Sequence, residues 1–457
     1  MLILLLRYSS ILDPLIEMGQ DNSKPSTYEE DKNGGKDYKK AKIGAISIYD
    51  NVVPKWIHRN VFLEILTEHI PNFKRIKKFR VGLANSDDEN YSSLLLRVRI
   101  KVELTDETIE HLSFILKVPH ESAEMQQMLK TVNFFDIENA TYTDLISKFQ
   151  SFYEDLGLDI VFAPKHYRFK TGLENEPKLA NTVLMEDLCE QGYANLNRLE
   201  CVNFEQTKMV LQKLAQYHAA GAQCRVVNGP YSSIYTQEMF DANEDRCLFI
   251  LNGIMGPFMS MFLETLKSYK NGDIYYDKFL TISANLSKRF FTLSKYDPEE
   301  FNVINHGDCF VNNLLFKFGT EDKLIDVRFV DFQLPRYGHP SIDLFNFILT
   351  SVHIDYKLKQ FDYFIKYYHD QLIKHLQLFE YKEYIPSLKE LHMELYKYGI
   401  YAITASVMVL PVVLMEPREE ESIDGKQFKD LLYTNSRYRA YIEEILPWLD
   451  NRGLLDM

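Results

Sequence analysis

The stretch that decides the fold covers residues 304–333 and reads INHGDCFVNNLLFKFGTEDKLIDVRFVDFQ. Its polar groups stand at Asp308 in a His-Gly-Asp triplet, at Asn313, and at Asp331 after an apolar run. We interpret Asp308 as the residue that receives or orients a hydroxyl proton, and Asn313 and Asp331 as oxygen ligands for magnesium. Phosphoryl transfer requires such a set, because its transition state is stabilised mainly by positioning and charge neutralisation. Mg²⁺ prefers hard oxygen ligands and takes few carboxylates from the protein.

The local pattern predicts a β-hairpin within this stretch. Asn313–Phe318 has the composition of a strand, residues 319–322 that of a polar turn, and Leu324–Phe332 that of a return strand rich in Val, Ile and Phe. Such a hairpin would bring Asn313 and Asp331 to the same end, at the mouth of a cleft. The alternative is that the aspartates are ordinary turn carboxylates, which would leave the histidine and the amide at these offsets unexplained.

These motifs resemble the ecdysteroid-kinase-like family of arthropods, which belongs with choline kinases and aminoglycoside phosphotransferases in the protein-kinase-like fold. The family pattern is close to His-Gly-Asp-x-Trp-x-Asn-Asn, then Asp-Phe-Gln, then Asp-Leu. The chain carries these motifs at residues 306–313, 331–333 and 343–344, with Phe310 in place of the tryptophan. The resemblance covers most of residues 51–415 and does not cover the N-terminal extension.

The resemblance implies a two-lobed, protein-kinase-like α+β fold with ATP bound between the lobes. We expect an antiparallel-sheet N-lobe with the nucleotide-binding strands and the hinge in residues 51–188. A larger, mainly helical C-lobe with the catalytic segment and the acceptor site would then occupy residues 189–457. A chain of 457 residues is long enough for two such units. Residues 1–50 form an extension, largely disordered by its composition.

The nucleotide side is expected to depend on a lysine and a glutamate. Leu112–Val118 is predicted to be a strand that carries Lys117, and a helix after it carries Glu138. The resemblance implies that Lys117 holds the α- and β-phosphates and that Glu138 pairs with it, as in protein kinases. The alternative for Glu138 is a solvated helix carboxylate.

The loop over the phosphates departs from the family pattern. The family carries Gly-Asp-Asn-Tyr, whereas residues 88–91 read Asp-Glu-Asn-Tyr, so that Asn90 is kept as a candidate nucleotide contact and the glycine is absent. Without glycine the backbone approaches phosphate less easily, and acidic side chains repel it. A plain hairpin turn explains the loop equally well. Further on, Met185, Glu186 and Asp187 resemble the hinge, whose backbone would bind adenine.

Three further residues are expected to have structural roles near the site. Asp343 would brace the catalytic loop by hydrogen bonds rather than touch substrate, and Ser341 is a candidate N-cap for the helix that follows. His218 ends an apolar face of a predicted helix at Phe204–Ala222, so we predict a core histidine that a neighbour satisfies.

Composition restricts the partners and the setting. A net charge of −13 and a pI near 5.5 argue against a nucleic-acid surface. Five scattered cysteines without a CxxC pair suggest neither a zinc site nor a disulfide framework, and a reducing cytoplasm is the simplest setting. The apolar segment Leu2–Leu6 is far shorter than the ~20 residues of a membrane span, so we expect no integral membrane segment. The sequence does not predict the oligomeric state.

The hypothesis is therefore an ATP-dependent kinase, with Mg²⁺, that phosphorylates a hydroxyl of an ecdysteroid-like or other hydroxylated apolar small molecule. The Met- and Phe-rich run Leu248–Phe262 is a natural place for acceptor specificity and equally natural as core. Two alternatives are a catalytically silent nucleotide- or ligand-binding protein of the same fold, and a choline or xenobiotic alcohol kinase.

Overall fold

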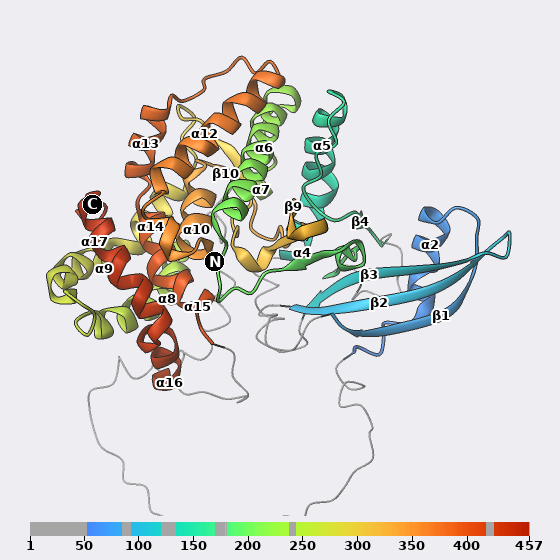
Figure 1. Ribbon diagram of the computed structural model, residues 1–457, viewed down its shortest axis with the longest axis horizontal. Coiled ribbons are helices and arrows are strands. Elements are labelled where there is room, and N and C mark those ends of the chain that lie inside the picture. Colours follow the sequence, from blue (N-terminus) through green and yellow to red (C-terminus); the bar gives the residue numbers. More distant parts are fainter. Residues whose placement is uncertain are drawn as a thin grey trace, which may run out of the picture.

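A computed structural model shows a smaller lobe built on a sheet and a larger lobe built mostly of helices, side by side (Figure 1). The predicted two-lobed α+β class is confirmed. The structure describes residues 53–84, 93–119, 134–169, 179, 181–236, 244–416 and 425–456. The extension at residues 1–50 and the loop with Asn90 lie outside the described residues.

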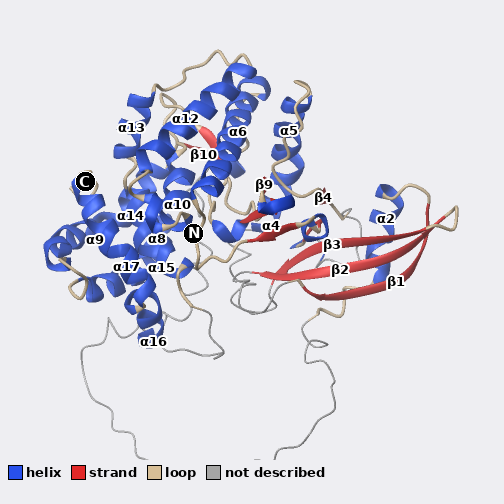
Figure 2. Cartoon of the chain, viewed as in Figure 1, coloured by secondary structure: helices blue, strands red, loops and turns tan. Residues whose placement is uncertain are grey.

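The smaller lobe is a five-stranded antiparallel sheet, drawn in red in Figure 2. Residues 96, 98, 100 and 102 of β2 alternate with more exposed neighbours and are at most 1% exposed, because successive side chains of a strand face opposite sides of the sheet. That face packs on Phe62 and Leu66 in the N-terminal helical segment. In sheet order, the strands are β1 (Phe73–Leu83), β2 (Ser93–Leu104), β3 (Ile109–Pro119), β5 (Val183–Glu186) and β4 (His166–Tyr167). The helical segment is a 3-10 turn at Arg59–Phe62 followed by α2 (Leu63–His69).

One helical column connects the two lobes. It consists of α4 (Phe134–Ala140), a π-helical turn at Thr141–Ile146 and α5 (Ser147–Glu154). Its first part contacts β5 of the sheet, and its last part packs along α6 (Phe204–Asn228) of the larger lobe (Figure 1). Glu138 on α4 is therefore held between the lobes.

The larger lobe is organised around α6, which is longer than the predicted helix Phe204–Ala222. A capping box of Asn203 and Gln206 begins it, and α12 packs against it. The longer helices around them are α8 (Glu244–Leu266), α9 (Gly272–Ser294), α10 (Ser341–Ser351), α12 (Phe361–Leu378), α13 (Leu388–Lys397) and α17 (Ser436–Asn451). The shorter ones are 3-10 turns at Leu188–Gln191, Val311–Asn313 and Thr320–Asp322, the helices α7 (Ser233–Thr236), α11 (Ile354–Lys357), α14 (Ile400–Thr404), α15 (Leu410–Val413) and α16 (Gly425–Lys429), and π-helical turns at Ala405–Val409 and Asp430–Thr434.

Two small sheets carry the stretch that decides the fold. The predicted hairpin forms from β8 (Leu314–Phe318) and β9 (Leu324–Phe329), and β6 (Tyr193–Asn195) extends it. The return strand stops at Phe329, not at Phe332 as predicted, because Asp331 has a positive φ of 68° that a strand does not accommodate. The second sheet pairs β7 (Val303–Asn305) with β10 (Arg336–Gly338), one on each side of the catalytic stretch.

The apolar run in α8 serves as core. Its buried side chains face α9 and the π-helical turn at Ala405–Val409, and they include Met255, Phe258 and Phe262, each fully buried. Among the described residues, Cys247–Leu266 is long and apolar enough to span a membrane, and the bent pair α13 with Ile400–Val413 passes the same test together. A core helix of a globular protein passes it too, and the buried face of α8, 44% of that window, fits that explanation.

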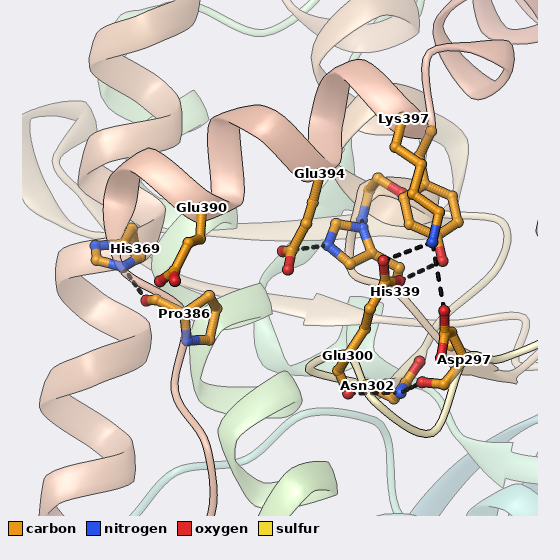
Figure 3. A network of polar contacts seen from close by, with 12 residues as sticks. Asp297, Glu300, Asn302, His339, His369, Pro386, Glu390, Glu394 and Lys397 are labelled. Atoms are coloured by element: carbon orange, nitrogen blue, oxygen red, sulfur yellow. Dashed lines mark hydrogen bonds and ion pairs between the residues drawn. The ribbon is translucent and has the colours of Figure 1, made fainter.

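A polar network fixes the strand pair that frames the catalytic stretch (Figure 3). His339, directly after β10, lies with its Nε2 2.9 Å from Glu394 Oε2 on α13, and its Nδ1 accepts from the backbone N–H of Ser341 at 3.1 Å. This bond replaces the predicted cap: Ser341 is the first helical residue, and its hydroxyl has no partner among the described residues. Before β7, Glu300 accepts from Lys397 at 2.6 Å and from the hydroxyl of Tyr398 at 2.6 Å.

We predict that Glu394→Ala lowers the free energy of unfolding by about 1–3 kcal/mol, because it leaves a buried ring nitrogen of His339 without an acceptor. Equilibrium denaturant unfolding measures the effect. The matched control is Lys366→Ala, which removes an exposed ion pair with Asp370 on α12 and should cost less than about 1 kcal/mol. Equal losses in the two variants would contradict the role assigned to Glu394.

Candidate active site

The His-Gly-Asp loop follows β7 and makes a turn that requires glycine. Gly307 has a φ of 78°, and a Cβ placed on it would lie 1.9 Å from the backbone oxygen of Leu334. Any other residue would meet backbone atoms that cannot move away cheaply, and it would also carry the strain of a left-handed conformation. The glycine therefore sets how closely Asp308 approaches the segment after β9.

Asp343 holds this loop through hydrogen bonds to its backbone. Its two carboxylate oxygens accept the backbone N–H groups of His306 at 2.6 Å and Gly307 at 2.9 Å. His218 Nε2 lies 3.1 Å from the same carboxylate, and its Nδ1 lies 2.8 Å from the hydroxyl of Tyr368. All these side chains are fully buried. The bracing role expected of Asp343 and the buried, satisfied state expected of His218 are both confirmed.

The ring of His306 connects the His-Gly-Asp loop to the end of β9. Its Nδ1 accepts the backbone N–H of Asp308 at 3.3 Å, so its Nε2 carries the proton and donates to the carbonyl of Val330 at 3.1 Å. Burial lowers the pKa of His306, although Asp343 and Asp331 act in the opposite direction. A neutral ring is the form that can donate at one nitrogen and accept at the other. The ring thus fixes the spacing between Asp308 and the segment that carries Asp331.

Phe332 gives the same segment an apolar anchor. Its ring is fully buried, and its centroid lies 4.6 Å from that of His306 and 5.3 Å from that of Tyr142. Tyr142 belongs to the π-helical turn directly after α4, which carries Glu138. The aromatic contacts therefore couple the position of Asp331 to that of the connecting column.

Lys117 on β3 meets carboxylates from both lobes. Its ammonium lies 2.7 Å from Glu138 Oε2 on α4, makes a second ion pair with Asp331, and lies 3.5 Å from the side-chain oxygen of Gln333. The predicted pair of Lys117 and Glu138 therefore forms. Burial lowers the pKa of Lys117, but Asp331 and Glu138 raise it more, so the amine is charged. Burial raises the pKa of Glu138 to about 7 against the opposing effect of Lys117.

The three candidate side chains, Asp308, Asn313 and Asp331, lie together at one end of the hairpin. The amide nitrogen of Asn313 donates to the backbone oxygen of Asp308 at 2.9 Å, which leaves the amide oxygen as the atom to face a cation. The backbone oxygen of Asn313 accepts from Val330, the neighbour of Asp331, at 3.1 Å. Asp331 is the more open group, with its side chain 25% exposed, and its second oxygen accepts from Gln333 at 3.0 Å.

The side-chain oxygens of Asp331 and Asn313 are suited to a magnesium ion that takes its other ligands from phosphate and water. Asp331 offers a carboxylate and Asn313 an amide oxygen, both hard ligands. No group of three or more His, Cys, Asp or Glu side chains that could hold a metal is found in the described part of the chain. That result does not count against Mg²⁺, which usually takes one or two carboxylates and fills its other positions with phosphate and water.

Comparison with known families adds to this geometry. A family description named ecdysteroid kinase-like matches residues 87–381, more than half of the chain. The chain belongs to the ecdysteroid kinase-like family. Membership implies a small-molecule kinase-like function with a small-molecule acceptor, and kinases of this kind generally use ATP and Mg²⁺. A search among curated proteins found no match.

The hinge predicted for the family lies in β5 and just after it. Met185 sits in the sheet between Ile115 and His166. The backbone N–H of Glu186 donates to the oxygen of Lys165 at 2.8 Å, and that of Asp187 points to the oxygen of Ser113 at 3.4 Å. A nucleotide contact at Glu186 would therefore use its carbonyl oxygen, whereas the carbonyl oxygen of Asp187 already accepts from the backbone N–H of Glu190 at 3.2 Å.

Two contacts at the site were not predicted from the sequence. The first is the direct ion pair of Lys117 with Asp331, supported by Gln333, although the Asp-Phe-Gln motif had marked both residues. The second involves Asp187, whose buried carboxylate accepts from Arg97 Nε and from the Ser113 hydroxyl, each at 2.7 Å. These two contacts connect the hinge to β2 and β3. The other carboxylate oxygen of Asp187 caps the 3-10 turn at Leu188–Gln191 by accepting from the backbone N–H of Cys189 at 3.2 Å, and the local sequence indicates only that cap.

We predict that Asp343→Asn makes the backbone N–H groups at residues 303–310 exchange with solvent faster, because one of two N–H groups loses its acceptor and faces an amide donor instead. Hydrogen exchange followed by mass spectrometry on that peptide measures the change. Asp362→Asn on the exposed side of α12 is the control and should leave the peptide unchanged. Unaltered exchange in Asp343→Asn would show that the loop is held in another way.

Proposed function

We propose that the protein is an ATP-dependent, magnesium-requiring kinase that phosphorylates a hydroxyl of a small molecule. The observation that carries the proposal is the contact of Lys117 on the sheet lobe with both Glu138 and Asp331. A lysine that can bind phosphate thus lies beside a carboxylate that can bind a metal ion, which supports the proposal. We place the boundary between an N-lobe of residues 51–188 and a C-lobe of residues 189–457 directly after the hinge residues Met185, Glu186 and Asp187.

Each of the five side chains named below has a role in the proposed phosphoryl transfer. Lys117 binds phosphate oxygens and Glu138 keeps it in place. Asp331 and the amide oxygen of Asn313 would hold magnesium, which would neutralise charge on the phosphates. Asp308, only 2% exposed, accepts the proton of the acceptor hydroxyl. The amide of Asn313 lies 3.4 Å from a carboxylate oxygen of Asp308 and orients it.

The acceptor that we propose is a largely apolar molecule with hydroxyl groups, such as an ecdysteroid, and the setting is the cytoplasm. Family membership supports the class of acceptor. The rival choline or xenobiotic alcohol kinase would share the same chemistry with a different pocket. A catalytically silent binder would share the fold, but it has no chemical need for the complete set of Lys117, Glu138, Asp308, Asn313 and Asp331.

Binding of Mg·ATP and the Asp308→Asn variant together test the proposal. Millimolar Mg·ATP should raise the melting temperature of the wild type and of Asp308→Asn alike, because a ligand that binds the folded state stabilises it. Turnover with a hydroxylated acceptor should fall ~10²–10⁴-fold in the variant, since it loses the base. Absence of stabilisation in the wild type would favour a silent binder that has lost nucleotide, and near-normal turnover of the variant would exclude Asp308 as the base.

The metal ligands are tested by magnesium dependence. We predict that Asp331→Ala raises the magnesium concentration needed for half-maximal turnover more than Asn313→Ala does, because a carboxylate carries full charge and an amide does not. Titration of turnover with MgCl₂ at fixed total ATP gives the comparison, and Asn312→Ala, on the neighbouring position of the loop, serves as control. Equal or reversed effects would contradict the metal-binding roles of Asp331 and Asn313.

A further inference from the structure

One face of the sheet lobe carries a dense group of positive charges. Phe79 on β1 and Val98 and Ile100 on β2 pack with α2, so the residues between them point to the opposite face (Figure 1). We call that surface the cationic face, and its side chains are Lys74, Arg75, Lys77, Lys78, Arg80, Arg99 and Lys101. Because the chain as a whole has a net charge of −13, this face reverses the sign of the molecule locally.

Two pairs of like charges lie directly opposite each other on neighbouring strands of this face. Lys78 on β1 is paired with Lys101 on β2, and Arg80 is paired with Arg99. Side chains at such positions are close together, and like charges there lower the stability of the sheet. Arg99 lies 3.4 Å from Glu190, but an exposed pair of this kind contributes little. Among the described residues, no carboxylate forms an ion pair with Lys78, Arg80 or Lys101.

The neighbouring end of the cationic face also has more cations than carboxylates. Lys74, Arg75 and Lys77 all lie within 3.1 Å of the carboxylate of Glu103, whose side chain is 8% exposed. This single carboxylate therefore compensates only one of three positive charges. The turn that joins β2 to β3 carries two acidic residues, at positions 106 and 107, so the cationic face ends there.

Protection of the sheet edge explains only part of this pattern. β1 is the outermost strand of the sheet, and lysine side chains on an outer strand prevent unwanted pairing with other chains. β2 is an inner strand between β1 and β3, so edge protection does not account for Arg99 and Lys101 opposite the cations of β1. Repulsion that the fold does not require indicates that the face binds something negatively charged.

The cationic face is suited to a surface that presents many separate anions. Next to the two like-charge pairs, β3 places His111 and Ser113, so no Phe, Tyr or Trp is present at these positions for the bases of a single-stranded nucleic acid to stack on. Two register shifts in the pairing of β1 with β2 make the outer edge irregular, which disfavours addition of a peptide strand. Acidic lipid headgroups at a membrane surface supply many anions and require neither aromatic side chains nor a regular edge.

We propose that the cationic face docks the protein on a membrane surface that contains acidic phospholipids. Each lysine or arginine held near such a surface strengthens binding about fivefold, and the attraction weakens as salt screens it. Docking relieves the repulsion within the like-charge pairs, because anionic headgroups then lie beside them. In combination with the proposed function, docking brings the enzyme to the phase in which a largely apolar acceptor dissolves, but the docking itself does not depend on that function.

The test neutralises one like-charge pair and, as a control, two lysines elsewhere. Lys78→Gln/Lys101→Gln changes the cationic face. Lys288→Gln/Lys374→Gln changes two exposed lysines on α9 and α12 and alters the net charge by the same amount. Flotation of the full-length protein with vesicles measures binding, both to phosphatidylcholine alone and to phosphatidylcholine mixed with phosphatidylserine. Binding of polyuridine RNA and of polyglutamate is measured on the same proteins by fluorescence anisotropy.

We expect the wild type to bind vesicles that contain phosphatidylserine and not vesicles of phosphatidylcholine alone. Binding should be roughly 30-fold weaker in Lys78→Gln/Lys101→Gln, from about fivefold for each lysine, and close to the wild-type value in the control. The midpoint of denaturant unfolding should rise in Lys78→Gln/Lys101→Gln, because repulsion across the strands is removed. Cations that are merely solvated would not produce weaker binding together with higher stability.

Absence of binding to phosphatidylserine vesicles in the wild type would overturn the proposal, as would equal weakening in the two double variants. Tighter binding of polyuridine or polyglutamate than of the vesicles, lost in Lys78→Gln/Lys101→Gln, would assign the face to a different partner and overturn it too. A lower unfolding midpoint in that variant would show that the cations are retained for stability, contrary to the proposal. Stabilisation by Mg·ATP and turnover do not depend on these outcomes, so the kinase assignment is tested separately.

Discussion

The site depends on one buried cation. An ammonium group removed from water is costly unless carboxylates surround it, and Lys117 obtains its carboxylates from two separate parts of the chain. Glu138 comes from the connecting column and Asp331 from the end of the hairpin in the helical lobe. Removal of either partner would leave Lys117 with a single carboxylate. The requirement to neutralise Lys117 thus sets where the two lobes meet.

A second set of contacts keeps the catalytic loop in register with that cluster. Asp343 accepts two backbone N–H groups of the loop, and the neutral ring of His306 spans from Asp308 to Val330. Phe332 adds a buried aromatic ring next to that of His306. The hydrogen bonds fix the orientation of the loop, and the aromatic contact excludes water. Displacement of either segment would therefore break hydrogen bonds and also expose apolar surface.

Much of this arrangement can be predicted from the sequence, because it follows from local residue patterns. The hairpin follows from strand composition around a polar turn, and the bracing role of Asp343 follows from its motif. The end of β9 was mispredicted because the left-handed backbone of Asp331 is invisible in a run of Val and Phe. The pair of Lys117 and Asp331 joins residues 214 positions apart, and such a contact depends on the assembled fold. The run Leu248–Phe262 shows the limit of composition, since methionine and phenylalanine serve equally in a core and in a pocket.

The engagement of Asp331 with Lys117 has a consequence for affinity. In this arrangement the lysine already neutralises the carboxylate that magnesium would use, so entry of a metal–nucleotide complex exchanges one set of ionic contacts for another. The measured binding free energy is then a difference between the two sets and not the sum of the new contacts. A modest dissociation constant would therefore be compatible with strong individual contacts.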